Sequence, residues 1–304
     1  MPDASATTAR KVKVPKQVIG PNQGVTQAFA KSIKRWLDDY NRDFIATVLK
    51  RYAQIMAGRV DMRKTADKAT AMDAPAPTIS GLSLQQAEAI ARMDIEQLPI
   101  IPARKISYRF VRQMLRHLSV AQRRALEKAG VSKSLIRRTF TVPVIRGQFI
   151  APNTAQKIPS YVEWSTKMIT KLSTQSRLKI QNAIAEALEH GKSLSALRAD
   201  IEKVKGMTAE RAERVALDQS CKLNNFIQLE NCKALGITEG IWIHVPGRFT
   251  SRVTHIAMNG KRFDLLTGMY DPEVGTHVHP GELPYCRCVY RPVLPEHILE
   301  EQPK

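Results

Sequence analysis

The sequence predicts an α+β protein that is mainly helical and carries a small antiparallel β unit near its C-terminus. Two observations lead to this prediction. Up to Leu235, apolar residues recur every three or four positions in several long segments, which is the period of an amphipathic helix. After Gly236 the pattern changes to short alternating runs separated by turn residues, as in strands. Helices are therefore expected first and strands last.

The bulk composition indicates a folded chain with a polyanionic neighbour. A length of 304 residues allows two compact domains, or one domain with extended helical arms. The apolar fraction of 43% is ordinary for a folded protein, and 6% aromatic residues are few for a surface that stacks single-stranded bases. Lys and Arg total 47 against 28 Asp and Glu, a net charge of +19. This excess favours nucleic acid, an acidic protein surface or a membrane face as partner.

Residues 1–20 are predicted to form a basic, flexible tail. No apolar core follows its cations, so the segment does not read as a secretory signal. No run in the chain approaches the roughly 18 apolar residues of a membrane-spanning helix, and no membrane partner is expected. Four cysteines in so long a chain are not a disulfide scaffold, and a reducing compartment fits best.

The first long helix is expected from a stripe of apolar side chains between Val25 and Ile55. The stripe predicts packing within this chain or against a neighbouring subunit. Gly58 is the expected end of the helix. Residues 60–81 read as a linker, and a short helix is predicted at Ser83–Met93. The stripe consists of Val25, Phe29, Ile33, Trp36, Tyr40, Phe44, Val48, Tyr52 and Ile55.

Residues 101–147 form a strongly basic helical region. The runs Tyr108–His117 and Val120–Ala129 each have an apolar face and a basic face, and Glu127 is the only acid in the region. Gly130 followed by Ser132 as a cap gives a helix-turn-helix outline, although any helix–Gly–helix corner gives the same letters. We therefore expect contact with phosphates or a partner rather than base readout. The cations assigned to nucleic-acid binding are Arg104, Lys105, Arg109, Arg112, Arg116, Arg123, Arg124, Arg137 and Arg138.

The segment from 139 to 236 is expected to begin with irregular or β-rich structure and to continue as three helices. Residues 139–163 contain three prolines, which predict that no helix forms there. A helix follows at Lys167–His190 and ends at Gly191. Ser193 is then expected to cap a short helix to about Val204, and Thr208 a longer one to Leu235.

Beyond Gly236, alternation predicts strands. Residues 240–245 form a strand candidate. The segment Arg252–Phe263 contains Asn259-Gly260 between apolar flanks, which is a strong hairpin signal. Two short strands turned at that dipeptide are therefore expected.

The segment 255–288 concentrates imidazole and thiol side chains, the ligands that zinc prefers. Cys286 and Cys288 could supply two ligands of a structural zinc site, with His255 and one of His277 or His279 completing the four. We take His279 as the fourth ligand. The Cys-x-Cys spacing is shorter than that of most zinc sites. The alternative is that the cysteines are buried small hydrophobes and the histidines are hydrogen-bonding loop residues.

A metal-dependent nuclease is the second chemical hypothesis. His255, Asn259 and His279 are similar to the residues of nucleases in which a histidine activates water beside a metal-held phosphate. Acids that could hold magnesium are few, and no oxyanion signature accompanies the cysteines. An enzyme is therefore not the favoured interpretation, and no catalytic residue is assigned. The acids considered are Asp264, Asp271 and Glu273.

An ordered set of motifs resembles a known family. The helical run RAERVALDQSCKLNNFIQLENCKALGI is followed by Trp242, Arg252-Val-Thr-His255, Asn259-Gly260, Phe263, Pro280-Gly281, Cys286-Arg287-Cys288 and Pro292. This order resembles the phage Mu protein F-like head morphogenesis domain of minor capsid proteins in tailed phages. The resemblance covers roughly Lys167–Pro295. Many members place Asn where this chain has Tyr285.

The resemblance implies a domain organisation and a function. The expected divisions are a tail at 1–20, a basic helical region at 21–163, the Mu F-like domain at 164–296 and a tail at 297–304. The implied function is that of a minor head protein, in the virion and, during assembly, in the host cytoplasm. Its expected partners are portal and capsid proteins, with the apolar stripe at Val25–Ile55 as the docking surface. Double-stranded DNA is also an expected partner, bound without sequence preference during packaging or delivery. The alternative function is the nuclease, acting on phage or host DNA.

Overall fold

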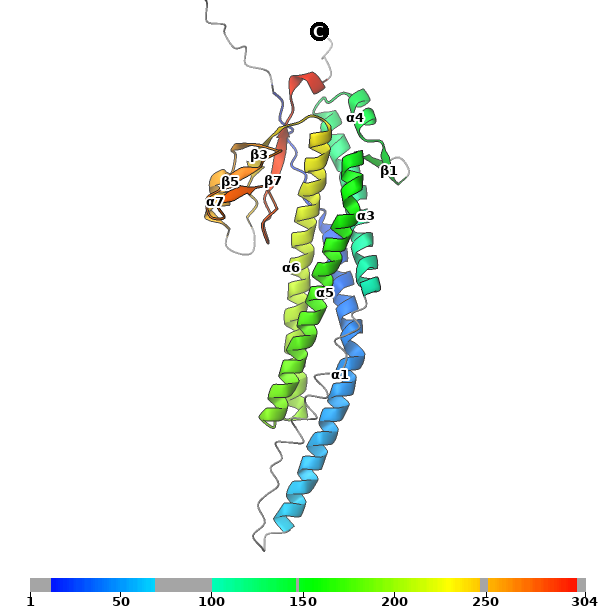
Figure 1. Ribbon diagram of the computed structural model, residues 1–304, viewed down its shortest axis with the longest axis vertical. Coiled ribbons are helices and arrows are strands. Elements are labelled where there is room, and N and C mark those ends of the chain that lie inside the picture. The colour runs from blue at the N-terminus through cyan, green and yellow to red at the C-terminus, as the bar shows by residue number, and fades with distance from the viewer. Residues whose placement is uncertain (1–11, 69–99, 146–147, 247–250, 300–304) are drawn as a thin grey trace, which may run out of the picture. The chain divides into compact units, whose positions relative to one another are not determined.

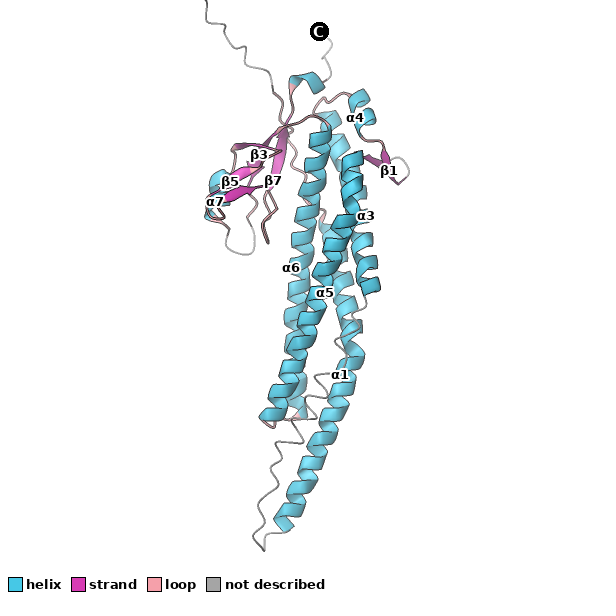
Figure 2. Ribbon diagram, viewed as in Figure 1, coloured by secondary structure: helices cyan, strands magenta, loops and turns pink. Residues whose placement is uncertain are grey.

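The computed structural model describes residues 12–68, 100–145, 148–246 and 251–299 (Figure 1). Most of them are helical, and the strands are short, antiparallel and mostly close to the C-terminus (Figure 2). The predicted α+β class is therefore confirmed. The chain divides into two compact units that interleave along the sequence. Unit 1 comprises Met1–Phe29, Ser107–Ser165 and Arg214–Lys304, and unit 2 comprises Ala30–Ile106 and Thr166–Glu213.

Long helices supply most of the described residues. The long helices are α1 (Gln23–Lys68), α3 (Ile100–Lys128), α5 (Pro152–Glu189) and α6 (Leu194–Ala234). The short ones are α4 (Lys133–Thr139), α7 (Val253–Met258) and the 3-10 helix η1 (Glu296–Ile298).

The strands form three small antiparallel sheets in the described part of unit 1. In the largest of them, β3 lies between β4 and β7, and Trp242 pairs with Tyr290 across β3 and β7. The bounds are β1 Val142–Ile145, β2 Gln148–Ile150, β3 Glu239–Ile243, β4 Arg262–Asp264, β5 Met269–Asp271, β6 Thr276–Val278 and β7 Val289–Val293.

Three predicted helix boundaries are wrong because continuous helices run through them. Helix α1 passes Gly58 and ends at Lys68, since one glycine costs a helix only about 1 kcal/mol relative to alanine. Residues 60–68 of the expected linker are thus helical, and residues 69–81 and the short helix at Ser83–Met93 lie outside the described residues. Helix α3 joins the two runs predicted in the basic region.

Helix α6 likewise replaces the two helices predicted after Ser193. The Ser193 hydroxyl accepts a hydrogen bond from the backbone N–H of Ala196 at 3.2 Å, which confirms that cap. Thr208 caps nothing, because its hydroxyl donates to the Val204 carbonyl at 2.8 Å within the same helix. Gly191 and Gly236 follow the ends of α5 and α6 with φ of +60° and +74°, as the predicted stops require.

Two predictions of irregular or β structure also need correction. Residues 139–163 hold only β1 and β2 before α5 begins at Pro152, a position where proline loses no helical hydrogen bond. Pro159 lies inside α5. The hairpin expected at Arg252–Phe263 is instead helix α7 followed by β4, and Asn259-Gly260 forms the turn between them, with Gly260 at φ +77°.

The apolar stripe of α1 is buried within this chain. In unit 2, Val48 and Tyr52 pack against Ile180, Ile184 and Leu197 of α5 and α6. The guanidinium of Arg177 lies 4.3 Å from the ring centres of both Tyr40 and Phe44. In unit 1, Phe29 stacks on Phe110 with ring centres 3.9 Å apart. The proposed role of the stripe in docking on another head protein is therefore wrong, because its central side chains already have partners here.

In unit 1, polar side chains of α6 hold the loop that precedes β7. The buried Asn225 amide donates to the Pro280 carbonyl at 2.9 Å and to the Cys288 carbonyl at 2.8 Å. Asp218 accepts the Tyr285 N–H at 2.6 Å. Gly281 fits under Asn225 only because it lacks a side chain, since a Cβ there would overlap the Asn225 amide nitrogen. The loop thus takes its conformation from α6.

Gly281→Ala is expected to lower the free energy of unfolding of unit 1 by about 3 kcal/mol. About 1 kcal/mol comes from a side chain at φ +77°, and the rest from breaking the two bonds of Asn225. Gly275→Ala is the matched control, because Gly275 also has a positive φ but nothing within 4 Å of an added Cβ. Denaturant unfolding of both variants measures the difference. Equal destabilisation would mean that the Asn225 contact does not matter.

Tyr52→Phe is expected to destabilise unit 2 by about 1–2 kcal/mol. The buried Tyr52 hydroxyl donates to two carbonyls at the turn between α5 and α6. The distances are 3.0 Å to Ala187 and 2.6 Å to Lys192. Tyr108→Phe on α3 is the control, because Tyr108 is 58% exposed. Urea unfolding followed by circular dichroism should separate the two variants. If Tyr108→Phe lowers the free energy of unfolding as much as Tyr52→Phe does, the stabilising role assigned to the Tyr52 hydroxyl is wrong.

Candidate metal centre

His255 is brought into the core of unit 1 by helix α7. The side chain is 2% exposed, and its ring packs edge-on against the Trp242 indole with centres 5.2 Å apart. The main chain after α7 is tied to β3, because Gly260 donates to the Trp242 carbonyl at 2.8 Å. The short helix thus fixes the imidazole against the sheet β4–β3–β7.

Cys286 and Cys288 come from the loop held by α6. Both side chains are buried, at 4% and 2% exposure, and both are free thiols. Tyr285, directly before them, has φ +61°, a left-handed conformation that costs a residue with a Cβ about 1 kcal/mol or more. Asparagine adopts that conformation more readily than tyrosine does. The bond from Tyr285 N–H to Asp218 stabilises the strained residue.

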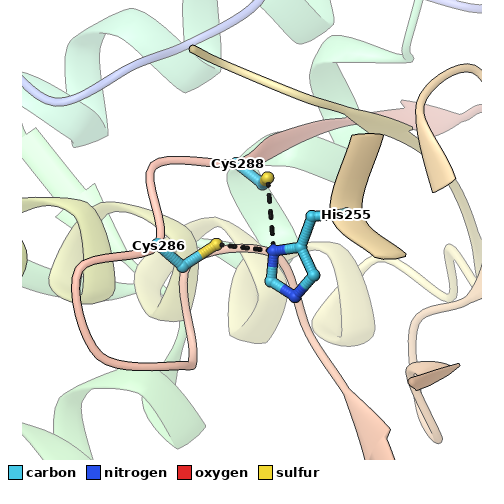
Figure 3. A group of neighbouring side chains, drawn as sticks. All are labelled: His255, Cys286 and Cys288. Atoms are coloured by element: carbon cyan, nitrogen blue, oxygen red, sulfur yellow. Dashed lines mark hydrogen bonds between the residues drawn. The ribbon is translucent and has the colours of Figure 1, made fainter. Parts of the chain in front are cut away.

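The two sulfur atoms converge on one ring nitrogen. The Nδ1 of His255 lies 3.3 Å from Cys286 Sγ and 3.7 Å from Cys288 Sγ (Figure 3). The three ligand atoms all lie within 4.8 Å of one another. Of the four ligands predicted from the sequence, the structure brings these three together.

The other ring nitrogen of His255 is fixed by a carboxylate. Nε2 donates to Asp271 Oδ2 at 3.2 Å, and Asp271 is fully buried at the end of β5. A carboxylate can only accept, so this bond sets the tautomer in which Nδ1 presents a lone pair to the two sulfurs. Asp271 Oδ1 also accepts the Glu273 N–H at 3.0 Å, which fixes the carboxylate in turn.

The pKa values of the cluster shift because the groups share protons. A hydrogen bond from Cys288 lowers the pKa of Cys286, burial opposes this, and the bond to His255 lowers it further. The hydrogen bond to Cys286, together with burial, raises the pKa of Cys288. Burial alone would lower the pKa of His255, but Cys286 and the Asp271 charge outweigh it and raise the value.

His279, expected as the fourth ligand, lies outside the group of three. Its Nε2 is 3.1 Å from the Leu265 carbonyl, and its Nδ1 is 3.4 Å from the Glu282 carboxylate. His277 is exposed and packs edge-on against Tyr270. The imidazole that approaches the sulfurs is His244, whose Nδ1 lies 3.6 Å from Cys288 Sγ. The expectation that His279 is the fourth ligand is corrected, because both of its ring nitrogens lie near the oxygen atoms of Leu265 and Glu282 and not near the sulfurs.

The Cys–His cluster lines a pocket of about 300 Å³ with a basic wall. Arg252, one of its arginines, donates to the Pro284 carbonyl at 3.2 Å. Sequence reasoning missed His244 and Asn225, and it considered Asp271 only as a possible magnesium ligand and not as the partner of His255. Buried amides and acids recurring at helical spacing along α6 were the available signal for Asn225, whereas His244 and Asp271 had none. The lining residues are Arg214, His244, Val245, Ser251, Arg252, His255, Pro284, Tyr285, Cys286, Arg287 and Cys288.

The predicted nucleic-acid-binding residues lie on α3 and α4. Arg116 and Arg123 are half-buried, and the Nε of Arg123 is 2.9 Å from the Glu127 carboxylate. Ser132 precedes α4, but its hydroxyl bonds the Ser134 hydroxyl at 2.8 Å and caps no backbone N–H. The exposed members of the set are Arg104, Lys105, Arg109, Arg112, Arg124, Arg137 and Arg138.

Half of this chain is similar to part of a known protein. An uncharacterized protein of Haemophilus influenzae is 29% identical over 157 residues, which is 50% of this chain and 33% of that protein. The chain thus spans about a third of that relative's length. No solved structure matches this chain. Among the described residues, no helix is long and apolar enough to cross a membrane.

Residues 178–291 match the family described as phage Mu protein F like protein. The matched segment lies within the range 164–296 expected for such a domain and contains α6, α7, most of the sheet β4–β3–β7 and the Cys–His cluster. The resemblance seen in the sequence is confirmed over this segment, which is similar to the phage Mu protein F like family.

Proposed function

We propose that this protein is a minor head protein of a tailed phage that acts in head morphogenesis. The family match over residues 178–291 carries the proposal. A few copies would lie near the portal and assist DNA packaging or delivery. Portal and capsid proteins are the proposed partners, in the virion and, during assembly, in the host cytoplasm.

A basic stripe on helix α3 supports contact with DNA. Lys105, Arg109, Arg112, Arg116 and Arg123 are spaced by four, three, four and seven residues, which places them on one side of the helix. We call these five residues the α3 stripe. The apolar face of the helix is turned the other way: its members in unit 1 include Phe110, Met114 and Leu118, all buried. One acid, Glu127, lies beside the stripe and pairs with Arg123.

The proposed DNA contact is with phosphates and not with bases. Helix α4, which would be the reading helix of a helix-turn-helix, has seven residues and is about 10 Å long. Its Arg137 and Arg138 are exposed and suit phosphate contact, as do Arg104 and Arg124 on α3. Lys and Arg on phosphates give affinity without sequence preference.

The contacts of His255 do not favour the alternative of a metal-dependent nuclease. One ring nitrogen bonds Asp271 and the other faces two sulfurs, so neither is placed to activate water. Asn259 accepts the His244 N–H at 2.9 Å, and Asp264 accepts the N–H groups of two following residues. Within the described ranges, the acids form no cluster of three that could hold magnesium.

The triple variant Lys105→Gln, Arg109→Gln, Arg112→Gln is expected to weaken binding of duplex DNA and to make it less salt-dependent. Removing one phosphate contact should reduce the slope of log K against log salt by about 0.9, so the slope should fall by about 2–3 in the triple variant. Fluorescence anisotropy with two duplexes of unrelated sequence measures the slope. The two duplexes should give the same constants.

A charge-matched control separates the α3 stripe from net charge alone. Lys179, Arg198 and Lys203 are exposed on α5 and α6, and their replacement by Gln should leave the salt slope unchanged. Equal weakening in both triple variants, or a preference for one duplex, contradicts the proposed contact. Plasmid cleavage in Mg²⁺ or Mn²⁺ that stops with chelator and with His255→Ala would establish the nuclease instead.

Deleting the gene from a phage that encodes this protein is expected to give heads that package or deliver DNA poorly. Mass spectrometry of purified wild-type heads should find the protein at a few copies per portal. Complementation with the wild-type gene should restore infectious particles. Absence of the protein from wild-type heads, or normal infectivity of the deletion phage, would contradict a role in the head.

A further inference from the structure

We propose that His244, His255, Cys286 and Cys288 bind one structural Zn²⁺ ion, with Asp271 as the residue that orients His255. The proposal uses His244 in place of the His279 expected from the sequence. It concerns the stability of unit 1 and is independent of the proposed DNA contact.

The spacing of the ligand atoms fits a tetrahedral zinc ion. With Zn–S bonds of about 2.3 Å and Zn–N bonds of about 2.05 Å, a tetrahedron separates N and S ligands by about 3.6 Å. Three of the four N to S distances in the proposed set are 3.3, 3.7 and 3.6 Å, the last from His244 Nδ1 to Cys288 Sγ. Two thiolates and two imidazoles are a ligand set that favours zinc over magnesium or calcium.

His244 completes the set from a position next to His255. It directly follows β3, and its N–H donates to the side chain of Asn259, which ends α7. One hydrogen bond thus joins the segments that carry the two histidines. His244 lies outside the tight group of three ligand atoms, so the proposal requires its side chain to rotate toward the other three when zinc binds.

The surroundings of His255 match those of a metal ligand. Metal-bound histidines usually donate their second N–H to a carboxylate, which orients the ring and makes the other nitrogen a better donor. Asp271 does this at 3.2 Å, and both residues are buried. Two thiolates beside a buried carboxylate are stable only where a cation lies among them. Zn²⁺ would supply that charge when bound, and both thiols would give up their protons to solvent.

A cysteine nucleophile is the competing interpretation of the same contacts. Cys286, His255 and Asp271 follow one another as nucleophile, base and orienting acid would. However, Cys286 is only 4% exposed, and a second thiol shares the same ring nitrogen. The close approach of two sulfurs to one Nδ1 is what a shared metal requires and what a nucleophile–base pair does not.

The test begins with the metal content of the full chain, purified without chelator and measured by mass spectrometry of elements. One zinc per chain is expected. After removal of zinc, titration with Co²⁺ should give the visible absorption of a tetrahedral site with sulfur ligands, saturating at one equivalent. A chain that holds no zinc and gives no such absorption overturns the proposal.

Single variants then test the ligand set. His244→Ala and Cys286→Ser should lose the tetrahedral Co²⁺ spectrum, whereas His279→Ala and the buried control Cys221→Ala should keep it. Asp271→Asn should weaken Zn²⁺ binding about 10- to 100-fold without changing the spectrum. If His244→Ala binds metal as the wild type does, or His279→Ala loses it, the assigned ligand set is wrong.

Alkylation keeps the test usable if variants fail to fold. In the wild-type chain, iodoacetamide should leave Cys286 and Cys288 unmodified while zinc is bound and modify both after chelator is added. Peptide mass spectrometry gives the modified fraction at each cysteine. Modification of Cys286 that is as fast with zinc as without it would overturn the proposal and favour the nucleophile.

Discussion

The C-terminal part of unit 1 depends on one buried side chain, that of Asn225. The loop between β6 and β7 carries both cysteines but has no helix or strand of its own in which to satisfy its carbonyls. Asn225 supplies two donors from inside α6, one to Pro280 and one to Cys288, at the two ends of the loop. A buried carbonyl without a donor costs about 1–3 kcal/mol, so removing either bond would release the loop.

That constraint determines what the loop can do. Because its ends are fixed on α6, the sulfur atoms are held on the side that faces His255, and the strained Tyr285 is kept in place by Asp218. Asp271 reaches the far side of the same imidazole from β5. Elements from separate stretches of the sequence thus meet at one ring, and the rigid helix α6 holds the loop that brings the sulfurs there.

The Cys–His cluster and the α3 stripe have different structural requirements. Zinc in the Cys–His cluster would add stability where short strands provide little hydrogen bonding. The α3 stripe would neutralise phosphates, which requires exposed charge and no fixed geometry. The sequence predicted both features. It predicted every residue of the α3 stripe, because helical spacing alone puts those side chains on one face. For the cluster it named three of the four proposed ligands.

The sequence by itself determined the class of fold, the resemblance over residues 178–291 to a protein family and the basic face of α3, because period, motif order and charge can be read directly from the sequence. It also predicted the turns at Gly191 and Gly236, where a positive φ is needed. The tertiary structure decided that α1 continues through Gly58 and α6 through the predicted cap at Thr208, since one glycine or threonine costs a helix only about 1 kcal/mol or less. It decided as well that α7 replaces a hairpin and that His244 replaces His279. Those outcomes depend on contacts between residues distant in the chain, for which the letters around each residue carry no signal.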